Sequence, residues 1–297
     1  MKAANTAALT ASRKRKTGQA REVWRRLRKS KTAMAGLFFL ILVVLVAIFA
    51  DVICDYETQV IAQDMSVQLQ PPSAEHWFGT DGYGRDIFAR VIHGARVSLL
   101  IGLGATVGSV LIAGLLGSSA GYYGGKVDNV IMRVMDMFMA IPSVLLALAI
   151  VAALGPSMVN LLIAVTISRI PPFTRIIRSA ILTVVDQEYV EAGRACGAND
   201  FLIIIRHVLP NAIGPIIIQA TMGVGQMILI AASLSFIGLG VTPPSPEWGS
   251  MLSEGREFMR YSPYVTIFPG IAIILTSLSL NLLGDGLRDA LDPKLKN

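Results

Sequence analysis

Few residues of this chain have the types and spacing that enzymatic chemistry needs. The segment "GSSAG" at 117–121 fits the G-x-S-x-G pattern of serine hydrolases, whose serine sits on a strand–turn–helix. Here the serine lies in an apolar run that predicts a helix. A rhomboid-like intramembrane protease would need a histidine deep in the membrane beside Ser119, but His76, His93 and His207 all fall in predicted loops. We therefore predict no catalytic residue and no enzyme.

Nucleotide and metal signatures are also missing from the sequence. No G-x-x-x-x-G-K-[ST] segment occurs, and "GGKV" at 124–127 lacks the hydroxyl residue that would hold magnesium. Neither H-E-x-x-H nor a pair of C-x-x-C motifs is present. We expect no metal site and no cofactor bound by this chain.

The composition indicates a membrane protein. Of 297 residues, 53% are hydrophobic and 15% are charged, whereas soluble domains average about 25% charged residues. The apolar residues form runs of about 17 to 25, the length that crosses a bilayer as a helix. We predict an all-α polytopic fold with six transmembrane helices, at 33–53, 97–122, 129–154, 158–171, 214–239 and 265–283. Pro142 and Pro171–Pro172 are expected to kink or end the third and fourth helices.

Small and polar residues recur in these spans. "GATVG" and "GSSAG" place glycines four apart, on one helix face, which allows helices to approach closely in lipid. We interpret these faces as packing within the chain rather than as a dimer contact. Five polar residues either line a water-filled path or bond neighbouring helices: Asn160, Thr166, Gln219, Gln226 and Asn281. Arg133 and Asp136, three residues apart, are interpreted as a local ion pair near the headgroups rather than a gate.

The placement of charge predicts the topology. The net charge is +6, and eleven of the 26 Lys and Arg residues precede residue 32, where Glu22 is the only acid. A basic tail before an apolar span is typical of a cytoplasmic N-terminus and of contact with anionic lipid, and it argues against nucleic acid. The first span lacks a signal-peptide cleavage site, so we interpret it as an uncleaved anchor. With six spans both termini are cytoplasmic, and Cys54 and Cys196 lie on opposite sides without a disulfide.

One charged segment interrupts the apolar runs: "YVEAGRACGANDFLIIIRHVLPN", from 189 to 211. Its pattern predicts a short helix ending near Cys196, with Gly197 in a left-handed cap. Asn199 or Asp200 would cap the next helix, and Pro210 would limit it. The residues alone leave two interpretations, a docking surface for a partner or a solvated connector.

"EAGRACG" followed by "HVLP" resembles the EAA loop of ATP-binding-cassette (ABC) importer permeases. That family has E-A-A, three residues, glycine, nine residues, then I-x-L-P. Five residues match at that spacing: Glu191, Ala192, Gly197, Leu209 and Pro210. Gly193 replaces the second alanine, and His207 stands where the isoleucine would be, in the form "HVLPN" seen in the peptide and nickel branch.

Other segments resemble the same branch, notably "HWFGTDGYGRDIFARVIHGARVSL", "LSFIGLGVTPPSPEWGSML" and "NLLGDGLRDALDPKLK". The chain resembles the C-type inner-membrane permease of dipeptide, oligopeptide and nickel importers. The resemblance implies a basic cytoplasmic tail at 1–32 and a first helix with its extracytoplasmic loop at 33–96. It further implies a binding-protein-dependent permease domain at 97–290, with the EAA loop at about 175–211, and a cytoplasmic tail at 291–297.

That resemblance also implies partners. The segment from Glu191 to Gly197, with Ala192 and Gly193, would form a coupling helix against an ATPase, supported by Leu209 and Pro210. Two cytoplasmic ATPase subunits would use the ATP, a second, different permease would complete the path, and an extracytoplasmic binding protein would deliver di- or oligopeptides. Gln219, Gln226 and Asn281 are the candidate path residues.

Two alternatives remain open at this point. Nickel, glutathione or another small solute could be the cargo of the same type of importer. An ion-coupled secondary transporter would need intramembrane carboxylates, for which Asp136 and Asp285 are the candidates, but it does not explain the EAA-like loop.

Overall fold

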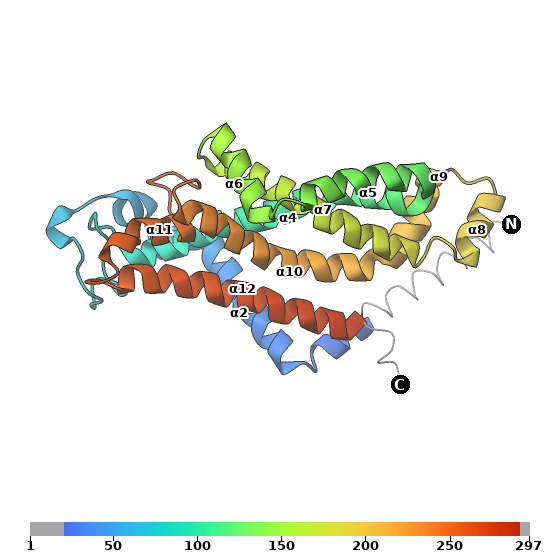
Figure 1. Cartoon of the computed structure of the whole chain (residues 1–297). Coiled ribbons are helices and arrows are strands. Elements are labelled where there is room, and N and C mark those ends of the chain that lie inside the picture. Colours follow the sequence, from blue (N-terminus) through green and yellow to red (C-terminus); the bar gives the residue numbers. More distant parts are fainter. Residues whose placement is uncertain (1–20, 292–297) are drawn as a thin grey trace.

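The computed structural model describes residues 21–291, and in this range it consists of helices and loops with one isolated β-bridge (Figure 1). The longer helices are α2 (Lys31–Ile48), α4 (Ile87–Tyr123), α5 (Gly125–Met139), α6 (Ser143–Leu154), α7 (Met158–Leu182), α10 (Leu209–Phe236) and α12 (Tyr264–Leu291). The short ones are α3 (Ala50–Ile53), η1 (Tyr56–Ile61), η2 (Met65–Val67), α8 (Glu188–Ala195), α9 (Asp200–Ile203), η3 (Ile204–Val208), α11 (Trp248–Gly255) and η4 (Arg256–Phe258). The all-α prediction is confirmed. Most of the predicted tail at 1–32, and 292–297 of the C-terminal tail, lie outside the described residues.

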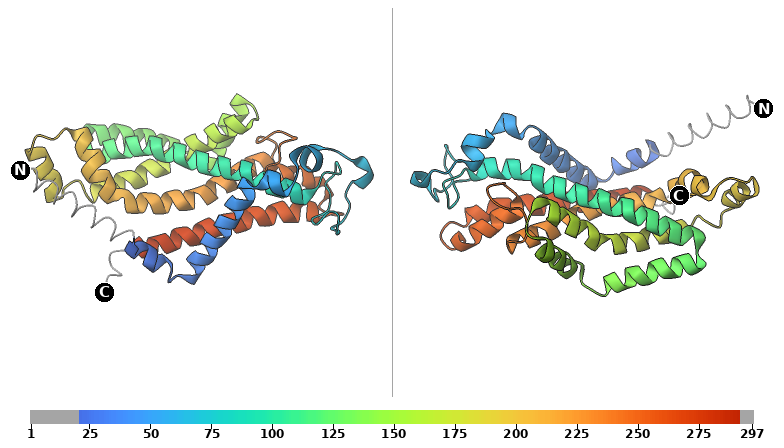
Figure 2. Two further views of the ribbon diagram at one scale, coloured as in Figure 1. Left: turned by 180° about the vertical axis from the view of Figure 1, so that it is seen from behind. Right: turned by 90° about the horizontal axis from the view of Figure 1, so that it is seen from above.

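The long helices form an elongated bundle with α8 at one end and α11 at the other (Figures 1 and 2). Four helical stretches are long and apolar enough to cross a membrane: α2, α4, the continuous helix Asp200–Phe236, and α12. The pair α5 and α6 adds a fifth if it counts as one span, bent by 82°. The expected break at Pro142 is confirmed, since that residue lies between the two helices. The count of six stays a prediction, because α7 is not among these stretches.

Two prolines predicted to limit helices do not do so. We expected the fourth span to end at Pro171, but α7 continues to Leu182. The beginning of α10 likewise includes Pro210, which we expected to limit a helix. Before Pro210 the helix forms a π turn, in which Leu209 N–H donates to Ile204 O, five residues earlier, in place of the residue four earlier. The helix thus continues into α10 through a local π-type hydrogen bond next to the proline.

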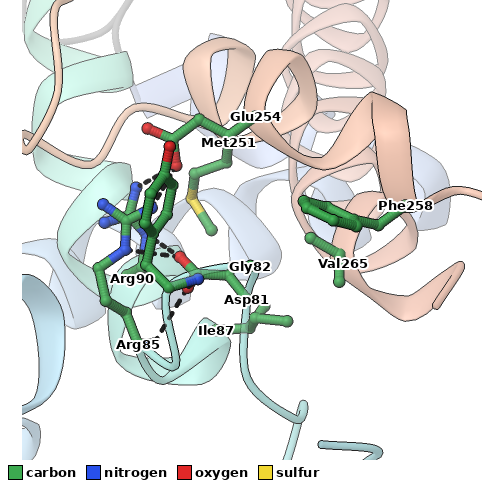
Figure 3. A pocket seen from close by; sticks show the side chains of 10 residues that line it. Asp81, Gly82, Arg85, Ile87, Arg90, Met251, Glu254, Phe258 and Val265 are labelled. Atoms are coloured by element: carbon green, nitrogen blue, oxygen red, sulfur yellow. Dashed lines mark hydrogen bonds and ion pairs between the residues drawn. The ribbon is translucent and has the colours of Figure 1, made fainter. Parts of the chain in front are cut away.

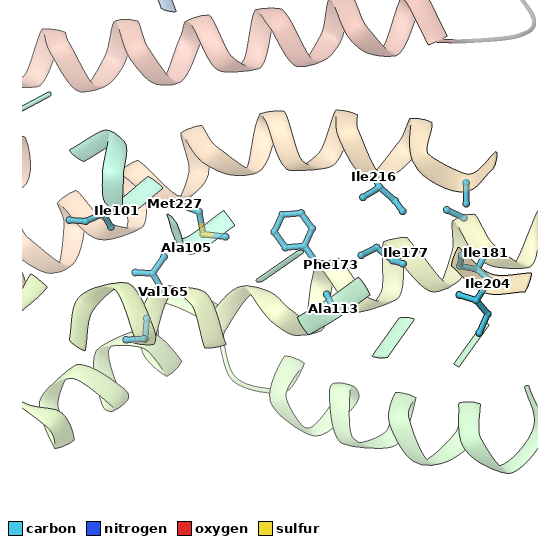
Figure 4. Close-up of a cluster of buried hydrophobic side chains, with 14 of the residues drawn as sticks. Ile101, Ala105, Ala113, Val165, Phe173, Ile177, Ile181, Ile204, Ile216 and Met227 are labelled. Atoms are coloured by element: carbon cyan, nitrogen blue, oxygen red, sulfur yellow. The ribbon is translucent and has the colours of Figure 1, made fainter. Parts of the chain in front are cut away.

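In α7 the tertiary packing outweighs the local penalty of proline. Pro171 is buried, and Phe173, Ile177 and Ile181 beyond it belong to the largest apolar cluster, shown in Figure 4. This cluster joins α4, α7 and α10 through residues such as Ile101 and Met227. Ending the helix at the proline would remove these side chains from the cluster and would lose their van der Waals contacts with α4 and α10.

The glycine faces of α4 pack against α7, as interpreted from the sequence. A Cβ on Gly117 would lie 2.8 Å from the backbone oxygen of Thr174, and one on Gly121 would lie 2.8 Å from Ile181. Ser119 is within α4, where its hydroxyl donates to Leu115 O, so the G-x-S-x-G match is helical. Small residues here let two helix backbones approach closely.

Candidate functional site

The segment that resembles an EAA loop forms a projecting helix, α8, at one end of the bundle (Figure 1). Glu191 and Ala192 are exposed on it, while Val190 is fully buried. Val190 belongs to the main apolar cluster together with Ile203 and Val208 of the following helices. The face of α8 that carries Val190 is therefore anchored to the bundle, and the exposed surface that includes Glu191 and Ala192 is accessible to a partner.

The turn after α8 is a Schellman motif. Ala198 N–H donates to Gly193 O at 3.1 Å, and Gly197 N–H donates to Arg194 O at 2.9 Å. Gly197 has φ +74°, the left-handed conformation that the sequence predicted for it. Asn199 then caps α9, because its side-chain oxygen accepts from Phe201 N–H at 3.0 Å. Both predicted caps are confirmed.

Tyr122 at the end of α4 ties this turn to the bundle. Its hydroxyl donates to the Asp200 carboxylate at 2.8 Å and accepts from Arg194 Nε at 3.3 Å. The guanidinium carbon of Arg194 also lies 4.8 Å from the centroid of the Tyr122 ring. Sequence reasoning missed Tyr122, since its partners are 72 and 78 residues away.

The departure from E-A-A at Gly193 is sterically mild. A Cβ on Gly193 would lie 3.7 Å from Ile203 Cγ1, an ordinary van der Waals contact, so the alanine of the family pattern would fit. Leu209 and Pro210 are partly buried at the beginning of α10. Leu209 packs against the main apolar cluster, and the supporting role of the two residues for α8 stays a prediction.

Basic residues in the α8-side half of α7 pair with α5. Arg175 contacts Asp136 at 2.5 Å, and Arg178 makes two 2.5 Å contacts with Asp128. The expected local pair of Arg133 with Asp136 is therefore wrong: across the bundle, α7 brings Arg175 to that carboxylate. These pairs connect the end of the α5–α6 span to α7.

The candidate path residues lie within the bundle and do not form one cluster of contacts. Gln226 accepts a hydrogen bond from Arg169, and Gln219 lies seven residues earlier on the same face of α10. Gln219 and Asn281 are both partly buried. Whether the three line a path stays a prediction.

The other two polar candidates from the spans make bonds within the chain. Asn160 Nδ2 donates to Leu154 O and Gly155 O at 2.9 Å, in the turn between α6 and α7. Thr166 Oγ1 donates to Leu162 O at 2.7 Å in α7. Asn160 therefore bonds the end of the neighbouring helix α6, which is one of the two alternatives for these polar residues. The Thr166 bond lies within its own helix and does not decide between them.

The opposite end of the bundle holds a buried charge network that sequence reasoning did not find (Figure 3). Asp81 contacts Arg85 at 2.7 Å and Arg90 at 3.5 Å, and both arginines contact Glu254, Arg90 at 3.1 Å. Two positive and two negative groups thus compensate each other. The network joins the loop before α4 to α11, and the cavity beside it holds only about 10 Å³. It is built to hold elements together, with no room for a ligand.

Within residues 21–291, no cluster of three His, Cys, Asp or Glu side chains could hold a metal. Cys196 is exposed and Cys54 is buried. Burial raises the pKa of the Cys54 thiol, which makes it a weak nucleophile near neutral pH.

Comparison with known proteins agrees with this architecture. Residues 113–297 match the family described as "Binding-protein-dependent transport system inner membrane component", and 18–72 match the "N-terminal TM domain of oligopeptide transport permease C". The chain therefore belongs to the inner-membrane permeases of ABC importers, of the peptide-transporter type.

Similar chains include the dipeptide transport permease DppC of Alkalihalophilus pseudofirmus, 48% identical over 93% of this chain and 90% of the relative. The glutathione transport permease GsiD of Pectobacterium atrosepticum is 45% identical over 93% and 92% of the two chains. Among solved structures, the inward-facing methionine ABC transporter MetNI has a TM-score of 0.56 at 16% identity, covering 68% of this chain and 97% of its own.

Membership in this family settles the general role. The protein is a multi-pass inner-membrane permease subunit and not an enzyme, and it works with ATPase and substrate-binding partners. ATP is used by the partner ATPase.

Proposed function

We propose that this chain is one of two different permease halves of an importer for di- and oligopeptides, and that α8 is its coupling helix. The observation that carries the proposal is the geometry of α8: an anchored helix with an exposed outer face bearing Glu191, ending in a rigid Schellman turn at Gly197. The relatives that transport dipeptides and glutathione support a peptide cargo. Nickel or another small solute is the alternative cargo.

The structure suggests how movement of α8 would reach the membrane. After α8, the chain forms one helix from Asp200 to Phe236, through the π turn and into the bundle. Asp200 at its beginning is hydrogen-bonded to Tyr122, the last but one residue of α4. A displacement of α8 by a closing ATPase would therefore act on two spans at once, and would drive alternation between inward-facing and outward-facing states.

We further propose that the α8 end faces the cytoplasm and the α11 end faces outside, with both termini cytoplasmic. The positive-inside distribution of Lys and Arg supports this orientation. The proposed organisation keeps the basic tail at 1–32, the first helix and outer loop at 33–96, the permease domain at 97–290 and the C-terminal tail at 291–297. The coupling loop itself is shorter than the predicted range of 175–211. Residues 175–182 belong to α7, and the next long helix begins at Asp200.

The ion-coupled alternative gains no support from its candidate carboxylates. Asp136 is exposed and paired with Arg175, and Asp285 is exposed near the end of α12. An ion-coupled transporter needs carboxylates inside the bundle to bind the coupling ion. Neither residue occupies such a position.

Thiol crosslinking at Cys196 tests the coupling assignment. Cys196 caps α8, next to the proposed contact, and Cys54 at the far end is a control within the same chain. In native membranes a short thiol-to-amine crosslinker should join Cys196 to a subunit that mass spectrometry identifies as a P-loop ATPase. The product should persist in Cys54→Ser and disappear in Cys196→Ser. A complex that hydrolyses ATP but gives no such product would contradict the role of α8.

A further inference from the structure

Arg169 lies in the middle of α7, eleven residues after its first residue and thirteen before its last. At about 1.5 Å per residue, this is roughly 17 Å and 20 Å from the two ends. A cation at this depth of a membrane bundle is costly and is usually paired or functional.

Among residues 21–291 the guanidinium of Arg169 has no charged partner. Its Nη2 donates to the neutral oxygen of Gln226, and its buried Nε has no acceptor in the part of the chain that the structure describes. Its carbon lies 5.9 Å from the centroid of the Phe173 ring. No carboxylate of residues 21–291 lies within the 4.0 Å limit of an ion pair. Arg175 and Arg178, on the same helix, each have an aspartate.

Arg169 has one polar neighbour, Gln226, and one aromatic neighbour, Phe173, among the contacts described above. Gln226 and Gln219 share a face of α10. That face also turns toward α12, since Met222 between the two glutamines contacts Gly284. Arg169 itself is partly exposed, so part of its side chain is accessible, while its Nε is buried.

We propose that Arg169 binds the carboxylate of the cargo as it passes through the permease, with Gln226 holding the guanidinium in place. The inference rests on the proposed function, because dipeptides and glutathione all carry a carboxylate. A planar guanidinium with unused N–H donors matches a carboxylate in geometry and charge. An Asp or Glu side chain of the second permease is the alternative partner for Arg169. The experiment distinguishes this partner from the cargo carboxylate.

The test uses the purified complex of this chain with its second permease and ATPases, without the binding protein. Binding of radiolabelled dialanine is measured in competition with unlabelled dialanine or dialanine amide. We expect the free acid to compete at least tenfold better than the amide, as a charge-assisted hydrogen bond would give. If dialanine and dialanine amide compete equally well, the wild-type complex alone already overturns the proposal.

Two matched variants test whether the preference for the free acid depends on Arg169. Arg169→Gln should abolish the preference for the free acid in a complex that still contains the second permease, while Arg133→Gln, which removes an exposed charge from α5, should keep it. If Arg169→Gln instead releases the second permease, the counter-charge belongs to that chain and the proposal fails. Failure of the importer assignment would appear separately, as a preparation with no associated ATPase.

Discussion

At the scale of single residues, the coupling turn depends on backbone conformation and not on packing. Gly197 has φ +74°, yet no atom lies within 4 Å of the position that its Cβ would take. A side chain there would meet open space, so its cost comes from the left-handed conformation alone, about 1–2 kcal/mol for most residues and more for branched ones. Asparagine tolerates this conformation better than other residues.

This difference predicts opposite results for two substitutions. Gly197→Val should abolish uptake while the chain stays in the membrane, because the strained turn would reorient α8. Gly197→Asn should keep most of the uptake. Substrate uptake in cells is measured at equal membrane abundance, and ATPase co-purification is the second measurement. Normal transport by the valine variant would show that the turn is only a connector.

The buried charge network at the α11 end gives a second prediction at the scale of single residues. Glu254→Gln leaves Arg85 and Arg90 facing Asp81 alone, with one positive charge uncompensated. We expect a loss of stability of up to about 3 kcal/mol, since breaking a buried ion pair strands the remaining charge. Glu257→Gln, an exposed change on the adjacent η4, is the control. Thermal unfolding in detergent measures both, and equal melting temperatures would contradict the role assigned to the network.

At the scale of elements, the contact between α4 and α7 is set by glycine spacing. A Cβ on Gly117 would lie 2.8 Å from the backbone oxygen of Thr174 in α7, whereas a Cβ on Gly114, three residues earlier on the same helix, would have nothing within 4 Å. The two positions therefore differ in packing and share the same helical conformation.

We predict that Gly117→Ala destabilises the protein by roughly 1–3 kcal/mol, because the helices must separate to accept the methyl group. Gly114→Ala should be neutral or stabilising by up to about 1 kcal/mol through helix propensity. Thermal unfolding of the purified chain in one detergent compares them directly. Equal effects of the two alanines would mean that α4 and α7 are not closely packed in the membrane.

At the scale of the whole molecule, the two ends of the bundle differ in character. The α8 end carries the proposed ATPase contact, and the α11 end carries the buried charge network (Figures 1 and 2). If the chain crosses the membrane as proposed, the two ends meet different compartments.

Accessibility of introduced cysteines tests this orientation. In a background without Cys54 and Cys196, single cysteines replace the exposed residues Glu75, Glu257 and Asp186. An impermeant thiol reagent should label positions 75 and 257 in intact cells, and position 186 only after permeabilisation. Labelling of 186 but not of 75 in intact cells would reverse the topology.

The sequence by itself determined the features that depend on neighbouring residues. Apolar runs predicted the four long spans and the bent α5–α6 pair, while the fourth predicted span stays unconfirmed. Pro142 predicted a break, and the order of Gly197 and Asn199 predicted two caps that the structure contains. Each of these follows from local sterics, local hydrogen bonding or the length of an apolar run, so no knowledge of distant segments was needed. The EAA-like spacing likewise lies within one short segment.

Only the tertiary structure decided which distant groups meet. Asp136 pairs with Arg175 and not with nearby Arg133, Tyr122 binds Asp200, and Arg85 reaches Glu254 across 169 positions. Tertiary packing also keeps α7 helical beyond Pro171, although a proline locally disfavours the helix interior. A charged side chain has several possible partners of similar energy, so its actual partner depends on which helices pack together. A proline carries a local penalty inside a helix, and only the tertiary packing decides whether that penalty is outweighed.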